Sequence, residues 1–202
     1  PEHGGGRGGD RAAGACQLAQ RLGRRRYRDV RPWPAKIAHY NSAVVHTGIG
    51  YDVHRLVEGR PLWLGGVEIE HTKGLDGHSD ADVLLHAICD AVLGAIGEGD
   101  IGSYFPPSDP QWKNAPSRIF LEKASELVGN VGGAIVNIDA TLIAEAPKIL
   151  PHVPAMKIAV AQALYISPDQ IGIKATTNEL LGFLGREEGM AAMAVAAVNL
   201  PQ

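Results

Sequence analysis

The sequence predicts an α/β or α+β domain in which helices pack against a β-sheet. Three observations predict this class: some segments carry apolar residues with a helical period, others are rich in Val, Ile and Thr, and the two kinds alternate along the chain. The chain has 202 residues, of which 45% are hydrophobic and 20% are charged. These values are ordinary for a globular domain and exclude a wholly disordered chain.

The first three elements follow one another between residues 44 and 96. Residues 44–52 are predicted as a strand interrupted by two glycines, and residues 61–69 as an extended stretch with a Gly-Gly bulge or turn. A helix is predicted to begin at Ser79 or Asp80, either of which can cap it, and to end near Ile96.

Five further elements complete the pattern. Helices are predicted over residues 117–128 and 151–165, and strands over residues 134–144, 171–176 and 190–200. No internal repeat is present in the sequence.

The charge distribution separates an N-terminal segment from the rest. Residues 1–46 carry a net charge of +6, whereas residues 47–202 carry −9. We therefore predict a disordered basic extension over residues 1–43 and one folded domain over residues 44–202. The Arg-rich run 24–26 is also compatible with a nucleic-acid patch, and the segment with an organelle transit peptide, but a solvated arm fits the composition better.

Compartment and partners are constrained by what the sequence lacks. No apolar run reaches the ~20 residues of a membrane-spanning helix. The two cysteines, Cys16 and Cys89, are too few for a disulfide framework, which favours a reducing compartment. We expect a cytoplasmic protein, or a plastid stromal one if the N-terminal segment is a transit peptide, with no membrane or nucleic-acid partner.

A set of His and Asp residues suggests a metal site. Asp52 and His54 are two residues apart on a predicted strand, so their side chains point to the same face. Asp82, His86 and Asp90 are spaced by four residues on the predicted helix and share one face near its apolar stripe. Two His and one carboxylate can form an open Zn²⁺ site, with Asp90 orienting a ligand. A surface Asp-x-His pair without a metal is the alternative for the strand alone.

Other residues suit a phosphate-bearing substrate. His78 and Ser79 stand at the predicted helix start, where free N–H groups favour anions, although ordinary capping explains them equally well. Residues 174–179 offer a cation and hydroxyl donors after a short strand, and glycines surround Phe183 and Arg186 in a tight loop. No Walker motif, Gly-x-Ser-x-Gly or nucleophilic Cys motif is present, so covalent catalysis is not suggested.

Several longer motifs follow one another within residues 47–200. They are Gly48-Ile49-Gly50-Tyr51-Asp52-Val53-His54-Arg55-Leu56, Leu64-Gly65-Gly66-Val67, His78-Ser79-Asp80-Ala81-Asp82-Val83, Gly99-Asp100-Ile101-Gly102, Ala146-Pro147-Lys148 and Lys174-Ala175-Thr176-Thr177. In order and spacing they resemble the 2-C-methyl-D-erythritol 2,4-cyclodiphosphate synthase family, and a chance match of so many motifs in register is very improbable.

The resemblance implies a fold, an assembly and residue roles. The fold is a mixed β-sheet with helices packed on one face, assembled as a homotrimer with active sites between neighbouring subunits. Asp52, His54 and His86 match divalent-metal ligands, usually for Zn²⁺, while Mg²⁺ binds with the substrate diphosphate. His78 and Thr177 match positions that stabilise the transition state. The implied substrate contacts are Asp52, His54, Ser79, Asp100, Ile101, Gly102, Phe105, Asp109, Ala144, Pro147, Lys148, Ile149, Leu150, Ala175, Thr176, Asn178, Glu179, Phe183 and Arg186.

Three residues depart from the family pattern. Pro107 stands where a carboxylate is usual, which removes a charge and a backbone donor near the sugar hydroxyls. Asn178 replaces a Thr and keeps hydrogen-bonding capacity. Glu187 replaces a Gly and places a negative charge beside Arg186.

The implied reaction converts 4-diphosphocytidyl-2-C-methyl-D-erythritol 2-phosphate to 2-C-methyl-D-erythritol 2,4-cyclodiphosphate and CMP, in isoprenoid precursor biosynthesis. Two other functions use the same residues. A metal-dependent phosphohydrolase would employ the His and Asp ligands with a water nucleophile. A non-catalytic protein that binds a nucleotide or isoprenoid diphosphate is suggested only by the missing carboxylate at Pro107.

Overall fold

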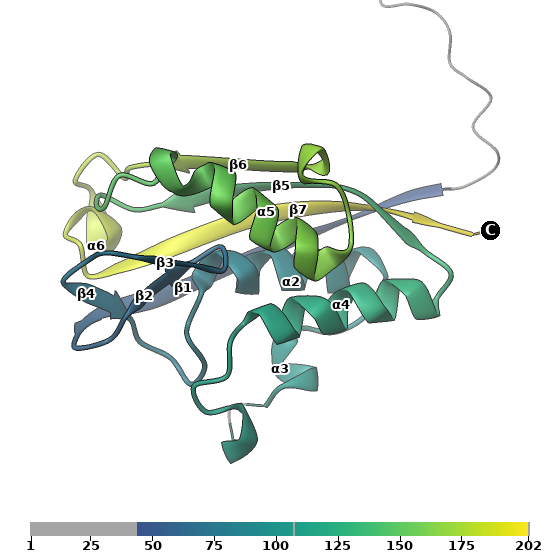
Figure 1. Cartoon of the computed structure of the whole chain (residues 1–202), viewed down its shortest axis with the longest axis horizontal. Coiled ribbons are helices and arrows are strands. Elements are labelled where there is room, and N and C mark those ends of the chain that lie inside the picture. Colours follow the sequence, from purple (N-terminus) through teal and green to yellow (C-terminus); the bar gives the residue numbers. More distant parts are fainter. Residues whose placement is uncertain (1–43, 107, 202) are drawn as a thin grey trace, which may run out of the picture. The chain divides into compact units, whose positions relative to one another are not determined.

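The computed structural model describes residues 44–106 and 108–201, and the predicted N-terminal extension lies outside the described residues. Its centre is a five-stranded sheet of order β4-β1-β7-β5-β6 (Figure 1). The strands are β1 (Val44–Glu58), β4 (Lys73–Leu75), β5 (Ala134–Ile143), β6 (Ile171–Thr176) and β7 (Gly189–Leu200). Only β5 and β6 are parallel neighbours, so the sheet is mixed.

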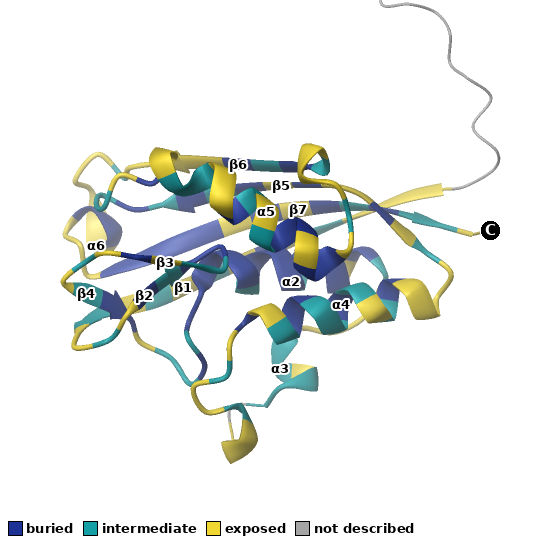
Figure 2. Cartoon of the chain, viewed as in Figure 1, coloured by how far each residue is buried: buried dark blue, intermediate teal, exposed yellow. Residues whose placement is uncertain are grey.

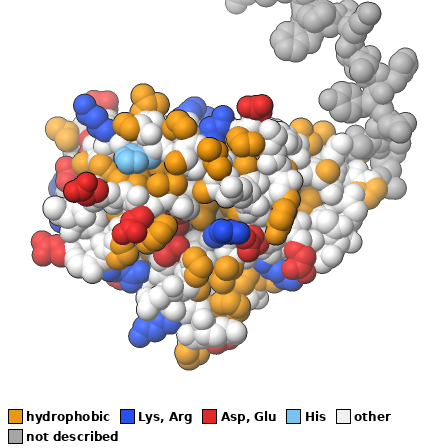
Figure 3. Space-filling view, in the orientation of Figure 1, with side chains coloured by type: hydrophobic (Ala, Val, Ile, Leu, Met, Phe, Trp, Pro, Cys, Tyr) orange, Lys and Arg blue, Asp and Glu red, His pale blue; other side chains and the backbone are white. Residues whose placement is uncertain are grey.

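Three helices cover one face of this sheet. α2 (Val83–Ala95) lies against β1 and β7, α5 (Val153–Leu164) lies against β6, and α4 (Arg118–Asn130) packs on both helices (Figure 1). Buried residues concentrate on α2, on parts of α4 and α5, and on the strands that these helices cover (Figure 2). On the helix side, acidic and basic side chains are interspersed with apolar ones (Figure 3). The predicted class, a mixed sheet with helices on one face, is confirmed.

The long predicted elements are confirmed, but β1 runs six residues past its predicted end at residue 52, and the other boundaries shift by four residues or fewer. The 61–69 stretch is a hairpin of β2 (Leu62–Leu64) and β3 (Val67–Ile69), turned by Gly65 and Gly66 with φ of +60° and +77°. The sequence patterns missed β4, α3 (Ile101–Tyr104), α6 (Gly182–Gly185) and three 3₁₀ turns, Pro110–Trp112, Leu150–His152 and Pro168–Gln170. No helix in the described part of the chain is long and apolar enough to cross a membrane.

Two glycines of β1 set its distance from α2. An added Cβ would lie 1.9 Å from the carbonyl oxygen of Ala87 at Gly50, and 2.1 Å from that of Ala91 at Gly48. The helix backbone therefore rests directly on the strand, which only glycine permits. This contact brings the side chains that follow in β1 within reach of α2.

The start of α2 corrects one expectation. Neither Ser79 nor Asp80 is the N-cap; the cap is Asp82, whose carboxylate accepts hydrogen bonds from the N–H groups of Leu84 and Leu85. The same fully buried carboxylate also accepts from Gly65 N at 2.9 Å and Gly66 N at 2.6 Å. Asp82 thus joins the β2–β3 turn to the helix, since four donors converge on it.

Replacing Asp82 is expected to destabilise the protein strongly. Asp82→Ala removes a cap and leaves the buried N–H of Gly65 and the partly buried N–H of Gly66 without their acceptor, so the free energy of unfolding should fall by about 3 kcal/mol. Urea denaturation followed by circular dichroism measures this change. Ser167→Ala is the control, because Ser167 caps an exposed 3₁₀ turn; it should cost about 1 kcal/mol or less. Equal losses for the two variants would contradict the role given to Asp82.

Candidate functional site

Three side chains, two from β1 and one from α2, converge between these two elements. Asp52 and His54 project from the same face of β1, and His86 projects toward them from α2. Asp52 Oδ2 lies 2.9 Å from His54 Nε2 and 2.9 Å from His86 Nδ1, and the two nitrogens are 3.1 Å apart. Ligand atoms on a tetrahedral Zn²⁺ lie ~3.3 Å apart, as bond lengths near 2.0–2.1 Å require. The three residues can therefore hold one divalent cation.

The hydrogen bond on the far side of His54 supports this reading. His54 Nδ1 lies 2.7 Å from the carbonyl oxygen of Asp76, which can only accept, so Nδ1 carries the proton. The neutral ring then turns an unprotonated Nε2 toward Asp52 and His86. A lone pair facing a carboxylate is unfavourable unless a cation or a proton lies between them. The donor set thus fits a metal with three protein ligands and an open position.

The local charges agree with a site built for positive charge. Burial raises the pKa of Asp52, but the hydrogen bonds and charges of His54 and His86 together lower it by more. The pKa therefore lies well below its usual range. Burial lowers the pKa of His54, yet the hydrogen bond and charge of Asp52 and the Asp76 carbonyl raise it above its usual value.

The cluster opens into a cavity of about 210 Å³. His78 and Ser79 line it from the loop before α2, and Ile101 and Gly102 line it from α3. Its remaining wall is aromatic, made by Phe105, Trp112 and Phe120, with ring centroids of neighbouring pairs 4.4–6.3 Å apart. Polar ligands at one end and an apolar wall at the other suit a small ligand that carries phosphate.

The loop that carries His78 and Ser79 is held by a residue that no sequence motif indicated. The Arg60 guanidinium donates to the carbonyl of Gly77 at 3.0 Å and to that of Ser79 at 2.7 Å. Because these carbonyls flank His78, one side chain restrains the backbone on both sides of it. Ser79 is nearly buried, and its hydroxyl accepts from Ala81 N at 3.1 Å.

Two expectations about α2 are wrong. His78 and Ser79 do not face free N–H groups of a helix start, because the helix begins at Val83 and the Asp82 carboxylate occupies its first donors. Asp90 does not orient His86; its carboxylate accepts from Ile101 N at 2.9 Å and anchors α3. Burial raises the pKa of Asp90, and the nearby negative charges of Asp100 and Asp52 add to the effect.

Two carboxylates predicted as substrate contacts have local partners instead of lining this cavity. Asp100 caps α3 and accepts from Ser103 N and Ser103 Oγ, each at 2.9 Å. Asp109 caps the 3₁₀ turn at Pro110–Trp112 and accepts from Gln111 N at 3.1 Å. Both remain close in sequence to residues that do line the cavity.

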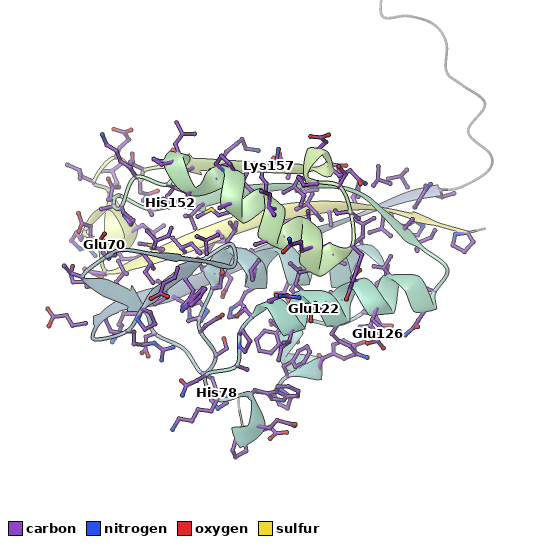
Figure 4. All side chains as sticks on the ribbon, viewed as in Figure 1. Glu70, His78, Glu122, Glu126, His152 and Lys157 are labelled. Carbon is purple, nitrogen blue, oxygen red and sulfur yellow. The ribbon has the colours of Figure 1, made fainter. Side chains whose placement is uncertain are left out.

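The other predicted site residues form a second group. It lies at the C-terminal ends of the parallel pair β5 and β6, where Asn178 N donates to Glu145 Oε1 at 2.8 Å and Ala144 N to Thr176 O at 3.0 Å. None of them lines the metal cavity in the described part of the chain. His152 follows Leu150, a member of this group, and it lies well away from His78 of the metal cavity (Figure 4). The group comprises Ala144, Pro147, Lys148, Ile149, Leu150, Ala175, Thr176, Thr177, Asn178, Glu179, Phe183 and Arg186.

Comparisons with known proteins give a consistent result. The model of the YgbB family matches residues 45–199. A 2-C-methyl-D-erythritol 2,4-cyclodiphosphate synthase of Synechococcus elongatus is 61% identical over 149 residues, which cover 74% of this chain and 93% of that protein. A bifunctional enzyme IspD/IspF of Sphingopyxis alaskensis is 59% identical over 155 residues, 77% of this chain. The chain matches only 40% of the length of that bifunctional protein.

Solved structures share the fold. The bifunctional IspDF of Campylobacter jejuni superposes with a TM-score of 0.76 at 43% identity, covering 80% of this chain and 44% of that one. The IspF of Plasmodium falciparum, solved as a CDP complex, superposes with a TM-score of 0.68 at 33% identity, covering 78% of this chain and 97% of that one.

Proposed function

Because the chain belongs to the YgbB family, we propose that it converts 4-diphosphocytidyl-2-C-methyl-D-erythritol 2-phosphate to 2-C-methyl-D-erythritol 2,4-cyclodiphosphate with release of CMP, in isoprenoid precursor biosynthesis. The observation that carries the proposal is the convergence of Asp52, His54 and His86 at one end of a cavity that His78 and Ser79 also line. Synthases about 60% identical to this chain support the substrate and the product.

The chemistry needs charge control more than a base. An oxygen of the 2-phosphate attacks the β-phosphorus, the bond from that phosphorus to the bridging oxygen breaks, and CMP leaves with that oxygen. The nucleophile is already an anion, so the barrier comes from bringing two phosphates together. When bound, Zn²⁺ at Asp52, His54 and His86 and Mg²⁺ on the diphosphate supply the positive charge that offsets this repulsion.

The side chains of this protein position the substrate around that charge. We assign His78 and Thr177 to stabilising the transition state, and Ser79 to holding the terminal phosphate of the diphosphate. Ile101, Gly102 and Phe105 line the cavity where the methylerythritol would lie. The aromatic wall excludes water from the β-phosphorus, which disfavours hydrolysis over ring closure. The second group would bind the cytidine and diphosphate, with Asp100 and Asp109 at the sugar end.

The division of the site supports assembly as a homotrimer with active sites between subunits. Thr177 and its neighbours do not line the metal cavity of their own chain, so a second copy is needed to complete the site. The sheet face opposite the helices supports such contacts, because it exposes apolar side chains, with 68% of Ile49 accessible. The other exposed members of this face are Tyr51, Val53, Met193 and Val195.

The product distinguishes the proposed function from its alternatives. The purified protein is incubated with the substrate and Mg²⁺, and the products are identified by ³¹P NMR. A cyclic diphosphate with stoichiometric CMP is expected. A linear phosphate would indicate a phosphohydrolase, and binding without turnover would indicate a non-catalytic protein.

Thr177→Ala is expected to reduce turnover more than it reduces nucleotide affinity. The hydroxyl is assigned to charge that develops on the diphosphate, so its loss should lower kcat by about 10²-fold, as loss of one transition-state donor does. Steady-state kinetics and the Kd of CDP measure the two effects. Thr72→Ala, in an exposed loop, is the control. A higher KM with unchanged kcat would show that Thr177 contributes uniform binding instead.

A further inference from the structure

A chain of hydrogen bonds runs from His86 into the protein interior through Ser117 and Asp80. His86 Nε2, the nitrogen that faces away from the metal cluster, lies 2.7 Å from Ser117 Oγ. The Ser117 hydroxyl donates to the Asp80 carboxylate, and Ser117 N donates to the same carboxylate at 2.9 Å. His86 belongs to α2, Ser117 precedes α4, and Asp80 lies in the loop between β4 and α2.

Helix capping does not explain Ser117. It occupies the N-cap position of α4, where a serine hydroxyl ordinarily accepts a hydrogen bond from the first turn. Its hydroxyl makes no such bond, and its backbone is already helical, with φ −61° and ψ −15°. The side chain is fully buried, and its hydroxyl contacts Asp80 and His86, with Ser79 Oγ farther away at 3.4 Å.

The protons in this chain can be assigned. A serine hydroxyl can donate one hydrogen bond, and Ser117 donates it to the Asp80 carboxylate. Toward His86, Ser117 Oγ can therefore only accept. His86 Nε2 must then carry its own proton, which leaves Nδ1 unprotonated and facing Asp52 and His54. Ser79 Oγ, at 3.3 Å from His86 Nε2, is a longer secondary contact.

We propose that Ser117 and Asp80 are positioning residues that fix His86 as the Nε2–H tautomer and hold its Nδ1 ready for the metal. The inference rests on the proposed function only in treating His86 as a metal ligand. Asp80 orients the hydroxyl by accepting three hydrogen bonds, from Ser117 Oγ, Ser117 N and Asp82 N. Outer partners of metal-bound His typically contribute 10–100-fold in metal affinity.

The test measures metal binding and the tautomer without substrate. In Ser117→Ala, the affinity for Zn²⁺ and for Co²⁺, determined by chelator competition, should fall 10–100-fold. Two-bond ¹H–¹⁵N correlations of the metal-free protein should show the Nε2–H tautomer in the parent and a mixture with the Nδ1–H form in the variant. That form gains population because Asp52 Oδ2, 2.9 Å from Nδ1, can accept its proton.

Two further variants make the result decisive. Ser125→Ala is the matched control: it removes another hydroxyl of α4, which donates to Leu164 O at 2.9 Å and is remote from the cluster, so metal affinity should not change. Asp80→Ala removes the acceptor of the Ser117 hydroxyl, so the affinity for Zn²⁺ should also fall. Parent-like affinity and tautomer in folded Ser117→Ala, or parent-like affinity in folded Asp80→Ala, would overturn the proposal. These readouts need no turnover, so failure of the proposed reaction would appear separately, as an absence of CMP release.

Discussion

His86→Ala is expected to remove bound metal and ring closure together. The variant retains only Asp52 and His54, which also lose the neighbour that holds the Asp52 carboxylate at 2.9 Å. Loss of a direct ligand should weaken metal affinity by more than the 10–100-fold typical of an outer partner. Because the metal supplies several kcal/mol of charge stabilisation, turnover should fall by about 10³-fold or more.

Elemental analysis of the purified protein and ³¹P NMR of the product measure the two losses. His71→Ala is the matched control, since His71 lies between β3 and β4, where its ring hydrogen-bonds with the Lys73 backbone. Both variants should retain the circular dichroism spectrum of the parent. Full turnover by His86→Ala protein that contains no metal would refute the metal role of the cluster.

Gly50→Ala is expected to disrupt both the fold and the site. The new Cβ would lie 1.9 Å from Ala87 O, and ordinary contact begins near 3.4 Å, so α2 must move away from β1 by roughly an ångström or more. Because backbone atoms cannot rotate out of the way, the free energy of unfolding should fall by about 3 kcal/mol or more. The movement also separates His86 from Asp52 and His54, so metal affinity should fall even in molecules that remain folded.

Thermal and urea unfolding, with Zn²⁺ titration of the folded fraction, measure these effects. Gly129→Ala is the control, because a Cβ there meets no atom within 4 Å and the residue lies inside α4. That change should stabilise the protein by about 0.5–1 kcal/mol. A Gly50→Ala protein with parent-like stability would show that the strand and helix can adjust without cost.

The long elements could be predicted because their side-chain periods differ. Segments of ten or more residues such as β5 and α4 display a period near 2 or 3.6 several times over. The elements β4, α3 and α6 have three or four residues, too few to show any period. The helix start at Asp82 was missed because its carboxylate is selected by a contact with Gly65 and Gly66, which local sequence does not reveal.

The same distinction applies to the site. Asp52 and His54 could be paired from their spacing on a strand, and His86 was joined to them by family resemblance. Arg60, Asp80 and Ser117 could not be placed, because their partners lie 17 to 37 residues away and each contact depends on how loops meet. A serine before a helix is usually a cap, so the sequence pattern pointed away from the contact that Ser117 makes.

The pleat of β1 ties two requirements to one strand. Its residues alternate between the proposed metal ligands Asp52 and His54 on one face and the exposed apolar side chains of Ile49, Tyr51 and Val53 on the other. Insertion or deletion of one residue before Asp52 would exchange the two faces, because side chains alternate with a period of two. The proposed chemistry and the proposed subunit association would then be lost in a single event. Variation in this strand is therefore confined to substitutions, and length changes must fall in the loops beyond it.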